Sequence, residues 1–386
     1  MTWNDERLGE LSDVCERLRA EPLFHLSLRS KELFHSDFLA WFVGAAPDAA
    51  TAVFAEWAGK SAAGTGVKEP SVERERDHLD LRILLPGRAP LVIENKVFSL
   101  PDEDQLAKYG KKISSGTACV LLSLTDPRWD GGHRSLGEHD WAYRSYGGLA
   151  DQISTAVREH RPSQGFHADL IAHYAELCRL LVRVRDLCGV KGADLDEPVQ
   201  LPDEALRRVR SVRIHDAVQK LRARQIEQTL RKELAPDLPA EVDLSSGYAA
   251  RARTPLLQAF VPVADATRPR EERDQIGWQF EGEQFRLAVR VGDPNPTGKK
   301  DPARRAAREA YVEERYGSFF DFDFAGVGTA PHPAPKKSWN GYEPDFVYRY
   351  RRVGDITVGR LVELARHYTK GAAEQARGRP PTVQQS

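Results

Sequence analysis

The sequence has few cysteines and no long apolar run. Its four cysteines, at positions 15, 119, 178 and 188, include no pair separated by two residues, so a zinc ribbon or an iron–sulfur cluster is not expected. No run of 18 apolar residues occurs among the 386, which excludes a transmembrane helix. The first residues lack the basic start and the apolar segment of a signal peptide. We therefore expect reduced thiols, a cytoplasmic location and no membrane partner.

Charge of one sign is not in excess either. Lys and Arg total 56 and Asp and Glu total 57, which gives a net charge of −1 at pH 7. A polyanion partner would therefore have to bind at a local basic patch rather than to the protein as a whole. The sequence also contains no internal repeat, no phosphate-binding glycine loop and no Gly-x-Ser-x-Gly elbow.

The length of 386 residues exceeds what one ordinary core accommodates, so we expect two domains. In the first half, apolar spacing predicts helices and strands in alternation. The helices are expected over 33–42, 49–57, 102–113, 146–157 and 168–187, a β-hairpin over 79–97 and a buried strand over 118–124. A Gly-, Pro- and Asp-rich stretch over 189–203 marks the boundary.

The second half opens with a basic segment. We expect one helix over 204–233, in which residues 205–233 carry nine basic and three acidic side chains. Arg207, Arg208 and Arg210 begin it and are candidate phosphate contacts. Strands are expected over 256–263, 276–291, 319–324 and 344–353, and helices over 303–316 and 358–368. The expected domains are 1–190 and 204–370, with a disordered tail over 371–386.

The predicted hairpin carries the residues that indicate chemistry. On a strand, Glu94 and Lys96 project to one side and Asn95 to the other. If the hairpin turns about Gly87, then Asp80 lies directly opposite Glu94, with Cβ atoms about 4.5–5.5 Å apart. Like charges so placed destabilise a sheet unless they share a cation, and Mg²⁺ prefers such oxygen ligands. We therefore predict a Mg²⁺ site, with Mn²⁺ as a substitute and Lys96 beside it to orient a nucleophilic water.

This order of residues resembles the PD-(D/E)XK nuclease superfamily, in which an Asp precedes a Glu-x-Lys strand. Gln105 and Tyr109, four residues apart on the next helix, match the Gln-x-x-x-Tyr element of its RecB-like branch. The resemblance implies that Asp80 and Glu94 bind the metal, with the Asn95 carbonyl and Glu32 as further ligands. It implies that Gln105 and Tyr109 position the substrate. It also implies an α/β fold, with a restriction-endonuclease-like core (a mixed central sheet flanked by helices) followed by an α+β accessory domain.

Simpler interpretations stay open for each residue. Glu94 and Lys96 could form a structural ion pair, although ionisable groups in a buried strand are costly unless they are paired or bind metal. Glu75 could supply a carboxylate in place of Glu32. Gln105 and Tyr109 could merely decorate an amphipathic helix, and the basic segment could be a solvated face.

We expect a metal-dependent nuclease that hydrolyses phosphodiester bonds in DNA. The resemblance implies a role in bacterial restriction, repair or anti-phage defence, which is an analogy at the level of the fold. The alternative is a non-catalytic module on a nuclease fold that binds nucleic acid or another protein. The sequence leaves open a homodimer or an activating protein partner.

Overall fold

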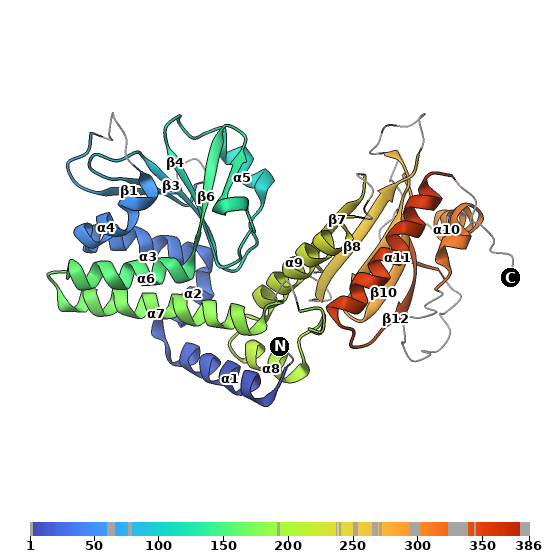
Figure 1. Cartoon of the computed structure of the whole chain (residues 1–386), viewed down its shortest axis with the longest axis horizontal. Coiled ribbons are helices and arrows are strands. Elements are labelled where there is room, and N and C mark those ends of the chain that lie inside the picture. The colour runs from blue at the N-terminus through green and yellow to red at the C-terminus, as the bar shows by residue number, and fades with distance from the viewer. Residues whose placement is uncertain are drawn as a thin grey trace. The chain divides into compact units, whose positions relative to one another are not determined.

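The chain forms two compact units that do not simply follow one another along the sequence (Figure 1). The computed structural model describes residues 3–59, 66–75, 79–190, 194–236, 238, 241–249, 254–264, 269, 272–292, 302–322, 339–342 and 345–378. The N-terminal unit contains Asn4–Gly189 and Asp203–Leu221. The C-terminal unit contains Met1–Trp3, Val190–Pro202 and Arg222–Ser386.

A mixed six-stranded sheet forms the centre of the N-terminal unit. Its strands, in spatial order, are β1 (Ser71–Arg74), β2 (Leu81–Leu84), β3 (Leu91–Lys96), β4 (Ala118–Ser123), β6 (His139–Ser145) and β5 (His133–Leu136). β3 pairs in parallel with β4, and β4 with β6, whereas the other neighbours are antiparallel. β3 and β4, which pair in parallel, are almost entirely buried, as parallel strands usually are, whereas β6 is mostly half-buried.

Helices cover both faces of this sheet. They are α1 (Asp5–Ala20), α2 (Pro22–Ser30), α3 (Glu32–Ala45), α4 (Pro47–Ala58), α5 (Glu103–Gly110), α6 (Tyr146–Glu159) and α7 (Gly165–Cys188). α5 packs on one face, where Leu106 joins Val92, Leu121 and Trp141 in an apolar cluster. α3, α4 and α6 contact the sheet strands β3, β4 and β6, and α7 lies against α6 (Figure 1). This mixed sheet between helices confirms the predicted fold class, as does the second sheet described below.

Local signals explain where the helices begin. The Asp102 carboxylate accepts hydrogen bonds from the backbone N–H groups of Asp104 and Gln105, so it caps α5. The Ser145 hydroxyl accepts from the Gly148 N–H and starts α6 directly after β6. Sequence patterns did not reveal α1, α2, β5 and β6, although Asn4 caps α1 in the same way. The predicted helix over 102–113 is shorter in the structure and ends at Gly110.

The predicted basic helix over 204–233 is wrong as a single element. It consists of α8 (Asp203–Ser211) and α9 (His215–Leu234), separated by a break at which Arg213 adopts a left-handed conformation with φ of 62°. The break turns Val212 and Ile214 inward, and both are buried. Residues 203–221, which the sequence pattern assigns to the second domain or its boundary, group with the N-terminal unit.

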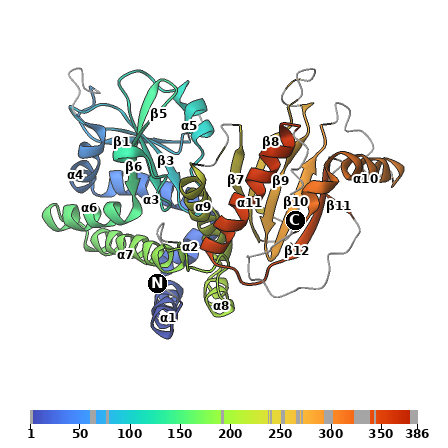
Figure 2. The same cartoon turned by 45° about the vertical axis from the view of Figure 1, so that its right-hand side comes forward.

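An antiparallel six-stranded sheet forms the centre of the C-terminal unit. Its strands, in spatial order, are β11 (Asn340–Tyr342), β12 (Phe346–Arg352), β10 (Gln284–Arg290), β9 (Gln275–Glu281), β8 (Thr254–Pro262) and β7 (Asp243–Ala249). α11 (Val358–Ala376) packs across β8 and β9 (Figure 2), and the Trp278 indole N–H donates to the Thr369 hydroxyl at 2.8 Å. α10 (Pro302–Tyr316) contacts β12.

Three further expectations for this unit need correction. The predicted strand over 276–291 is two antiparallel strands, β9 and β10. The predicted strand over 319–324 begins instead within a short 3₁₀ helix, Gly317–Phe320, and residues 323 and 324 lie outside the described part. The predicted disordered tail from residue 371 is helical at first, because α11 continues to Ala376 and buries Ala372 and Ala373. Residues 379–386 lie outside the described part.

No single helix in the described part of the chain is both long and apolar enough to cross a membrane. The pair α3 and α4 meets that test only when the two helices are taken together, and they are bent by 119°.

Candidate active site

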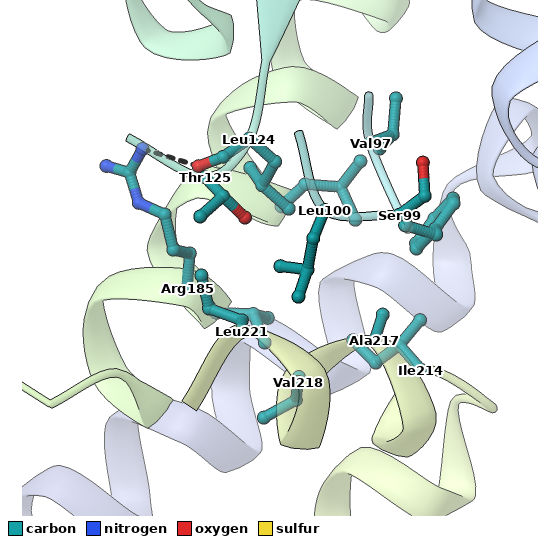
Figure 3. A pocket seen from close by; sticks show the side chains of 13 residues that line it. Val97, Ser99, Leu100, Leu124, Thr125, Arg185, Ile214, Ala217, Val218 and Leu221 are labelled. Carbon is teal, nitrogen blue, oxygen red and sulfur yellow. Dashed lines mark hydrogen bonds between the residues drawn. The ribbon is translucent and has the colours of Figure 1, made fainter. Parts of the chain in front are cut away.

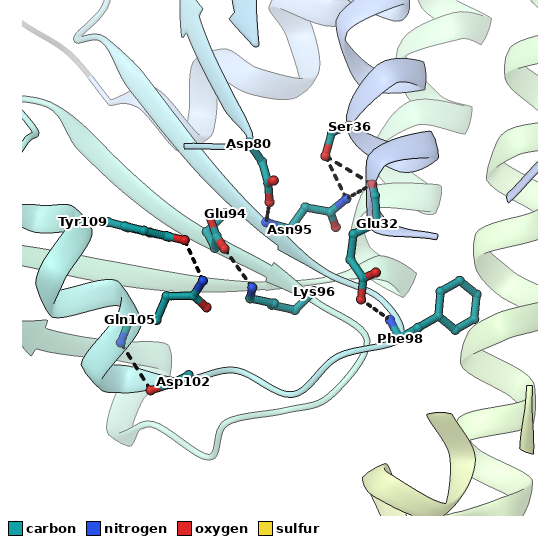
Figure 4. A network of polar contacts seen from close by, with 10 residues as sticks. All are labelled: Glu32, Ser36, Asp80, Glu94, Asn95, Lys96, Phe98, Asp102, Gln105 and Tyr109. Atoms are coloured by element: carbon teal, nitrogen blue, oxygen red, sulfur yellow. Dashed lines mark hydrogen bonds and ion pairs between the residues drawn. The ribbon is translucent and has the colours of Figure 1, made fainter. Parts of the chain in front are cut away.

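The hairpin register brings Asp80 opposite Glu94. β2 and β3 pair with Leu81 opposite Ile93, which is the register expected for a turn about Gly87. Asp80 precedes the first residue of β2, so the same register sets it across from Glu94. Figure 4 shows the two carboxylates next to one another at the end of β3, with Lys96 beyond Glu94.

Glu94 is a buried carboxylate with only half of its oxygens satisfied. Its side chain is 3% exposed, and its Oε1 atom lies 2.9 Å from the Lys96 ammonium. The second oxygen, Oε2, is buried and has no hydrogen-bond partner. Burial raises the pKa of Glu94 to about 7, and the nearby Asp80 carboxylate adds to this rise against the opposing effect of Lys96. The same ion pair outweighs the effect of burial on Lys96 and raises its pKa, so Lys96 stays an ammonium.

The Asp80 carboxylate is held by a hydrogen bond from the backbone of β3. Its Oδ2 atom accepts a hydrogen bond of 2.7 Å from the Asn95 N–H (Figure 4). Burial still raises the pKa of Asp80, and the charges of Glu32 and Glu75 act in the same direction. Both facing acids therefore resist ionisation for two reasons, the loss of water and the presence of other carboxylates.

Glu32 joins these acids from the first turn of α3. Its Oε1 atom accepts from the Phe98 N–H at 3.0 Å, so the carboxylate lies near the segment that follows Lys96. Its charge raises the pKa of both Asp80 and Glu94. Glu75, the alternative from the sequence, also raises the pKa of Asp80 and has a left-handed backbone with φ of 51°.

These residues fit a divalent cation, although they do not complete a site by themselves. The buried Oε2 atom of Glu94 has no hydrogen-bond partner, and the pKa values of Asp80 and Glu94 are raised. A bound cation would give this oxygen a partner and would favour the ionised form of both acids. Among the described residues, no three side chains of His, Cys, Asp or Glu form a group that could hold a metal ion. A cation bound by Asp80 and Glu94 would therefore also need main-chain and solvent oxygens, which suits Mg²⁺ because that ion keeps several waters.

The Gln-x-x-x-Tyr pair lies on the same face of the sheet. The Gln105 amide donates to the Tyr109 hydroxyl at 2.6 Å on α5 (Figure 4). The charge that Tyr109 would carry is close enough to influence the pKa of Lys96. The structure thus brings together Glu32, Asp80, Glu94, Lys96 and this pair.

Arg207, Arg208 and Arg210 form no contact with these residues. They lie on α8, where the Arg207 and Arg208 guanidinium groups both pair with Glu204, Arg208 at 2.8 Å. The side chains of Arg207 and Arg208 are 70% and 44% exposed, so they face solvent. Part of the positive charge that the sequence suggests is therefore offset locally.

An apolar cavity separates the end of β3 from the first turns of α9. Val97 and Leu100 line it from the segment after Lys96, and Leu124 lines it from the end of β4 (Figure 3). Ala217 and Val218 line it from α9. The segment that follows the Glu-x-Lys strand is thus near α9 within the N-terminal unit.

A buried polar network on the far side of β3 was not predicted from the sequence. The Tyr146 hydroxyl donates to the Asn95 Oδ1 atom, and the Asn95 amide donates to the Glu32 carbonyl oxygen and to the Ser36 hydroxyl, each at 3.2 Å. His35 has its Nδ1 atom 3.2 Å from the Tyr174 hydroxyl, and burial lowers its pKa to about 3. The sequence signal for this network is Asn95 itself, because it lies on the same side of the strand as Ile93 and Val97 and a buried amide needs hydrogen-bond partners.

The comparison with protein families agrees with this geometry. The family model described as the PD-(D/E)XK nuclease superfamily matches residues 23–176, which include α3, the hairpin, the Glu-x-Lys strand and α5. The match covers 154 of the 386 residues, and over these residues it confirms the superfamily resemblance that the sequence indicates. No curated protein and no solved structure matches the chain.

Proposed function

We propose that the protein is a metal-dependent nuclease that hydrolyses phosphodiester bonds in DNA. The observation that carries this proposal is the pairing of two mutually repelling carboxylates, the half-buried Asp80 and the buried Glu94, with the Lys96 ammonium at one strand end. A structural ion pair needs only one acid and one base. Here a second carboxylate lies beside the pair, and the pKa values of both acids are raised. The superfamily match supports the same class of activity.

Each residue has a role that follows from its surroundings. Asp80 and Glu94 would hold Mg²⁺ or Mn²⁺, with Glu32 and the Asn95 carbonyl as further oxygen donors. The bound cation would supply Lewis acidity toward the scissile phosphate and a water of lowered pKa. Because Lys96 stays protonated, we assign it to orienting the water and offsetting negative charge on the phosphate. Gln105 and Tyr109 would position the substrate, as in the RecB-like branch.

Two other surfaces would contact DNA. Arg207, Arg208 and Arg210 on α8 would bind phosphates without regard to sequence. In the C-terminal unit, Arg286 and Arg290 lie on β10, on the sheet face opposite its buried apolar residues, and Arg286 pairs there with Glu281. Arg290 pairs there with the neutral amides of Gln258 and Gln275. We propose that this accessory unit binds nucleic acid and that the protein acts in bacterial restriction, repair or anti-phage defence.

Cleavage of defined substrates tests the proposal. Purified protein is incubated with linear, circular and single-stranded DNA and with RNA, each with EDTA, Mg²⁺ or Mn²⁺. We expect cleavage of DNA only with metal, and none above background for Lys96→Ala. Retention of full activity by Lys96→Ala would remove that residue from the mechanism. Binding without cleavage under every condition would instead favour a non-catalytic nucleic-acid-binding module.

A further inference from the structure

One residue, Asn95, links three of the elements that meet at the end of β3. The Asn95 backbone N–H donates to Asp80, which precedes β2. Its side-chain amide donates to the Glu32 carbonyl oxygen and the Ser36 hydroxyl on α3, and its side-chain oxygen accepts from Tyr146 at the start of α6. Asn95 is 1% exposed, so no water competes for these bonds.

The bonds of this buried amide are matched to its chemistry. An asparagine side chain offers two N–H donors and one carbonyl acceptor, and here two acceptors face the amide nitrogen and one donor faces the oxygen. Tyr146 is also fully buried, so its hydroxyl has little freedom to find another partner. A satisfied buried network of this kind fixes one arrangement of its elements, because each broken bond leaves a polar group unpaired.

The elements fixed by Asn95 carry the acids of the site. Glu32 is held through its own carbonyl oxygen, while its carboxylate accepts from the Phe98 N–H, three residues after Asn95. Asp80 is held through the Asn95 peptide. Asn95 therefore links two of the acids, Glu32 through its side chain and Asp80 through its backbone N–H, whereas Glu94 and Lys96 keep their mutual ion pair.

We propose that Asn95 is a positioning residue that, fastened by Tyr146 and Ser36, sets Asp80 and Glu32 around the cation site at the end of β3. This inference rests on the proposed nuclease function and adds a role for the middle residue of the Glu-x-Lys motif. Residues that orient metal ligands typically change metal affinity or activity by about 10–100-fold when they are removed. Neither Tyr146 nor Ser36 is itself a proposed ligand, although the Ser36 hydroxyl also donates to the Glu32 carbonyl oxygen at 3.3 Å.

The test compares matched deletions of one hydroxyl group in the full-length protein. Tyr146→Phe and Ser36→Ala remove bonds to Asn95. Tyr316→Phe and Ser27→Ala are the controls, because Tyr316 donates to the buried Asp274 in the C-terminal unit and Ser27 to the Phe24 carbonyl oxygen on α2. Mn²⁺ binding is measured by electron paramagnetic resonance of free Mn²⁺ without DNA, and thermal unfolding checks the fold.

We expect Tyr146→Phe to raise the Kd for Mn²⁺ about 10-fold and Ser36→Ala to raise it less, with both controls within about twofold of wild type. The Mn²⁺ concentration for half-maximal cleavage should shift by the same factor, and excess Mn²⁺ should restore kcat without changing the KM for DNA. If Tyr146→Phe does not fold, Ser36→Ala carries the comparison.

The outcomes separate the two proposals. Wild-type affinity for Mn²⁺ in Tyr146→Phe and Ser36→Ala, or equal losses in the controls, would overturn the positioning role and leave the nuclease proposal intact. Wild-type protein that binds Mn²⁺ but cleaves no substrate would overturn the nuclease function, while a selective loss of affinity in the two variants would still support the role of Asn95.

Discussion

Each unit contains a buried glutamate, but the surroundings shift the pKa values of these two residues in opposite directions. In the C-terminal unit, Glu227 accepts from Arg224, Arg231 and the Ser246 hydroxyl, and these partners lower its pKa despite its burial. In the N-terminal unit, Glu94 has one cationic partner, one oxygen without a partner and a raised pKa. The contrast separates an acid that stabilises the fold from an acid that is available to bind a ligand.

A second pair of acids repeats the contrast. Asp274 accepts from the hydroxyl groups of Tyr311 and Tyr316 and from the Gly292 N–H, so three donors surround one buried carboxylate. Asp80, the corresponding acid of the N-terminal unit, has one such donor, the Asn95 N–H, and has other carboxylates nearby. Burial alone therefore does not mark a functional acid, whereas incomplete pairing together with like charge does.

The largest expected effect comes from replacing a buried carboxylate by an amide, at Glu94 and, for comparison, at Glu227. Glu94→Gln should reduce metal-dependent cleavage by about 10²–10³-fold or more, because it removes a proposed ligand charge, and it should not lower the unfolding midpoint. Glu227→Gln should leave cleavage near wild type and destabilise the protein by about 1–3 kcal/mol, because it breaks a satisfied buried network. Cleavage rates and calorimetric unfolding measure both. Equal loss of stability in the two variants would abolish the distinction.

The next effect is a dependence of stability on pH. The pKa of Glu94 is about 7 in the folded protein and 4.5 when unperturbed, so the native state binds the extra proton between these values. The contribution of Glu94 to the free energy of unfolding of the metal-free protein should therefore fall as the pH rises from about 5 to about 8, by at most about 3 kcal/mol. His35, whose pKa is about 3 in the folded protein and 6.5 when unperturbed, contributes in the opposite sense up to about pH 6.5, so the effect of Glu94 is the difference between wild type and Glu94→Gln. Calorimetry of both proteins across this range measures that difference. It should decline with rising pH, and Mg²⁺ should reverse the decline at the upper end of the range; a difference that does not change with pH would show that Glu94 ionises normally.

The smallest expected effect concerns charges that are paired but exposed. Replacing Arg207 and Arg208 by Gln should weaken DNA binding a few-fold and reduce the slope of log K against log salt by about 0.9 for each phosphate that is no longer neutralised. Glu204→Gln should strengthen binding, because it frees both arginines from their shared partner. Fluorescence anisotropy at several salt concentrations measures the slopes. An unchanged slope in the double variant would assign α8 to structure alone.

The order of elements around the site could be predicted from the sequence because it depends on short-range patterns. Alternating apolar residues and the turn about Gly87 are enough to set the β2–β3 register, and with it the position of Asp80 opposite Glu94. The superfamily resemblance and the fold class are confirmed, whereas the roles of the individual residues stay predictions. The metal, the DNA substrate and the RecB-like branch stay predictions as well.

Long-range contacts could not be predicted in the same way. Nothing near Asn95 in the sequence indicates that Tyr146, 51 residues away, donates to its side chain. The break between α8 and α9 was missed because Arg213 is an ordinary helix former, and its left-handed conformation follows from burying Val212 and Ile214. The local ion pairs of Glu204 similarly reduce a basic character that composition overstates.

The two units divide α9 between them after Leu221, and this division matters for the design of shortened proteins. A shortened chain that stops at Gly189 would look like a natural nuclease fragment, since it contains the whole region matched by the superfamily. It would nevertheless lack Ala217 and Val218, and so uncover the apolar residues Val97 and Leu100 just past Lys96. Inactivity of such a fragment would report a damaged scaffold rather than missing chemistry, and fragments ending after Leu221 are the fairer starting point.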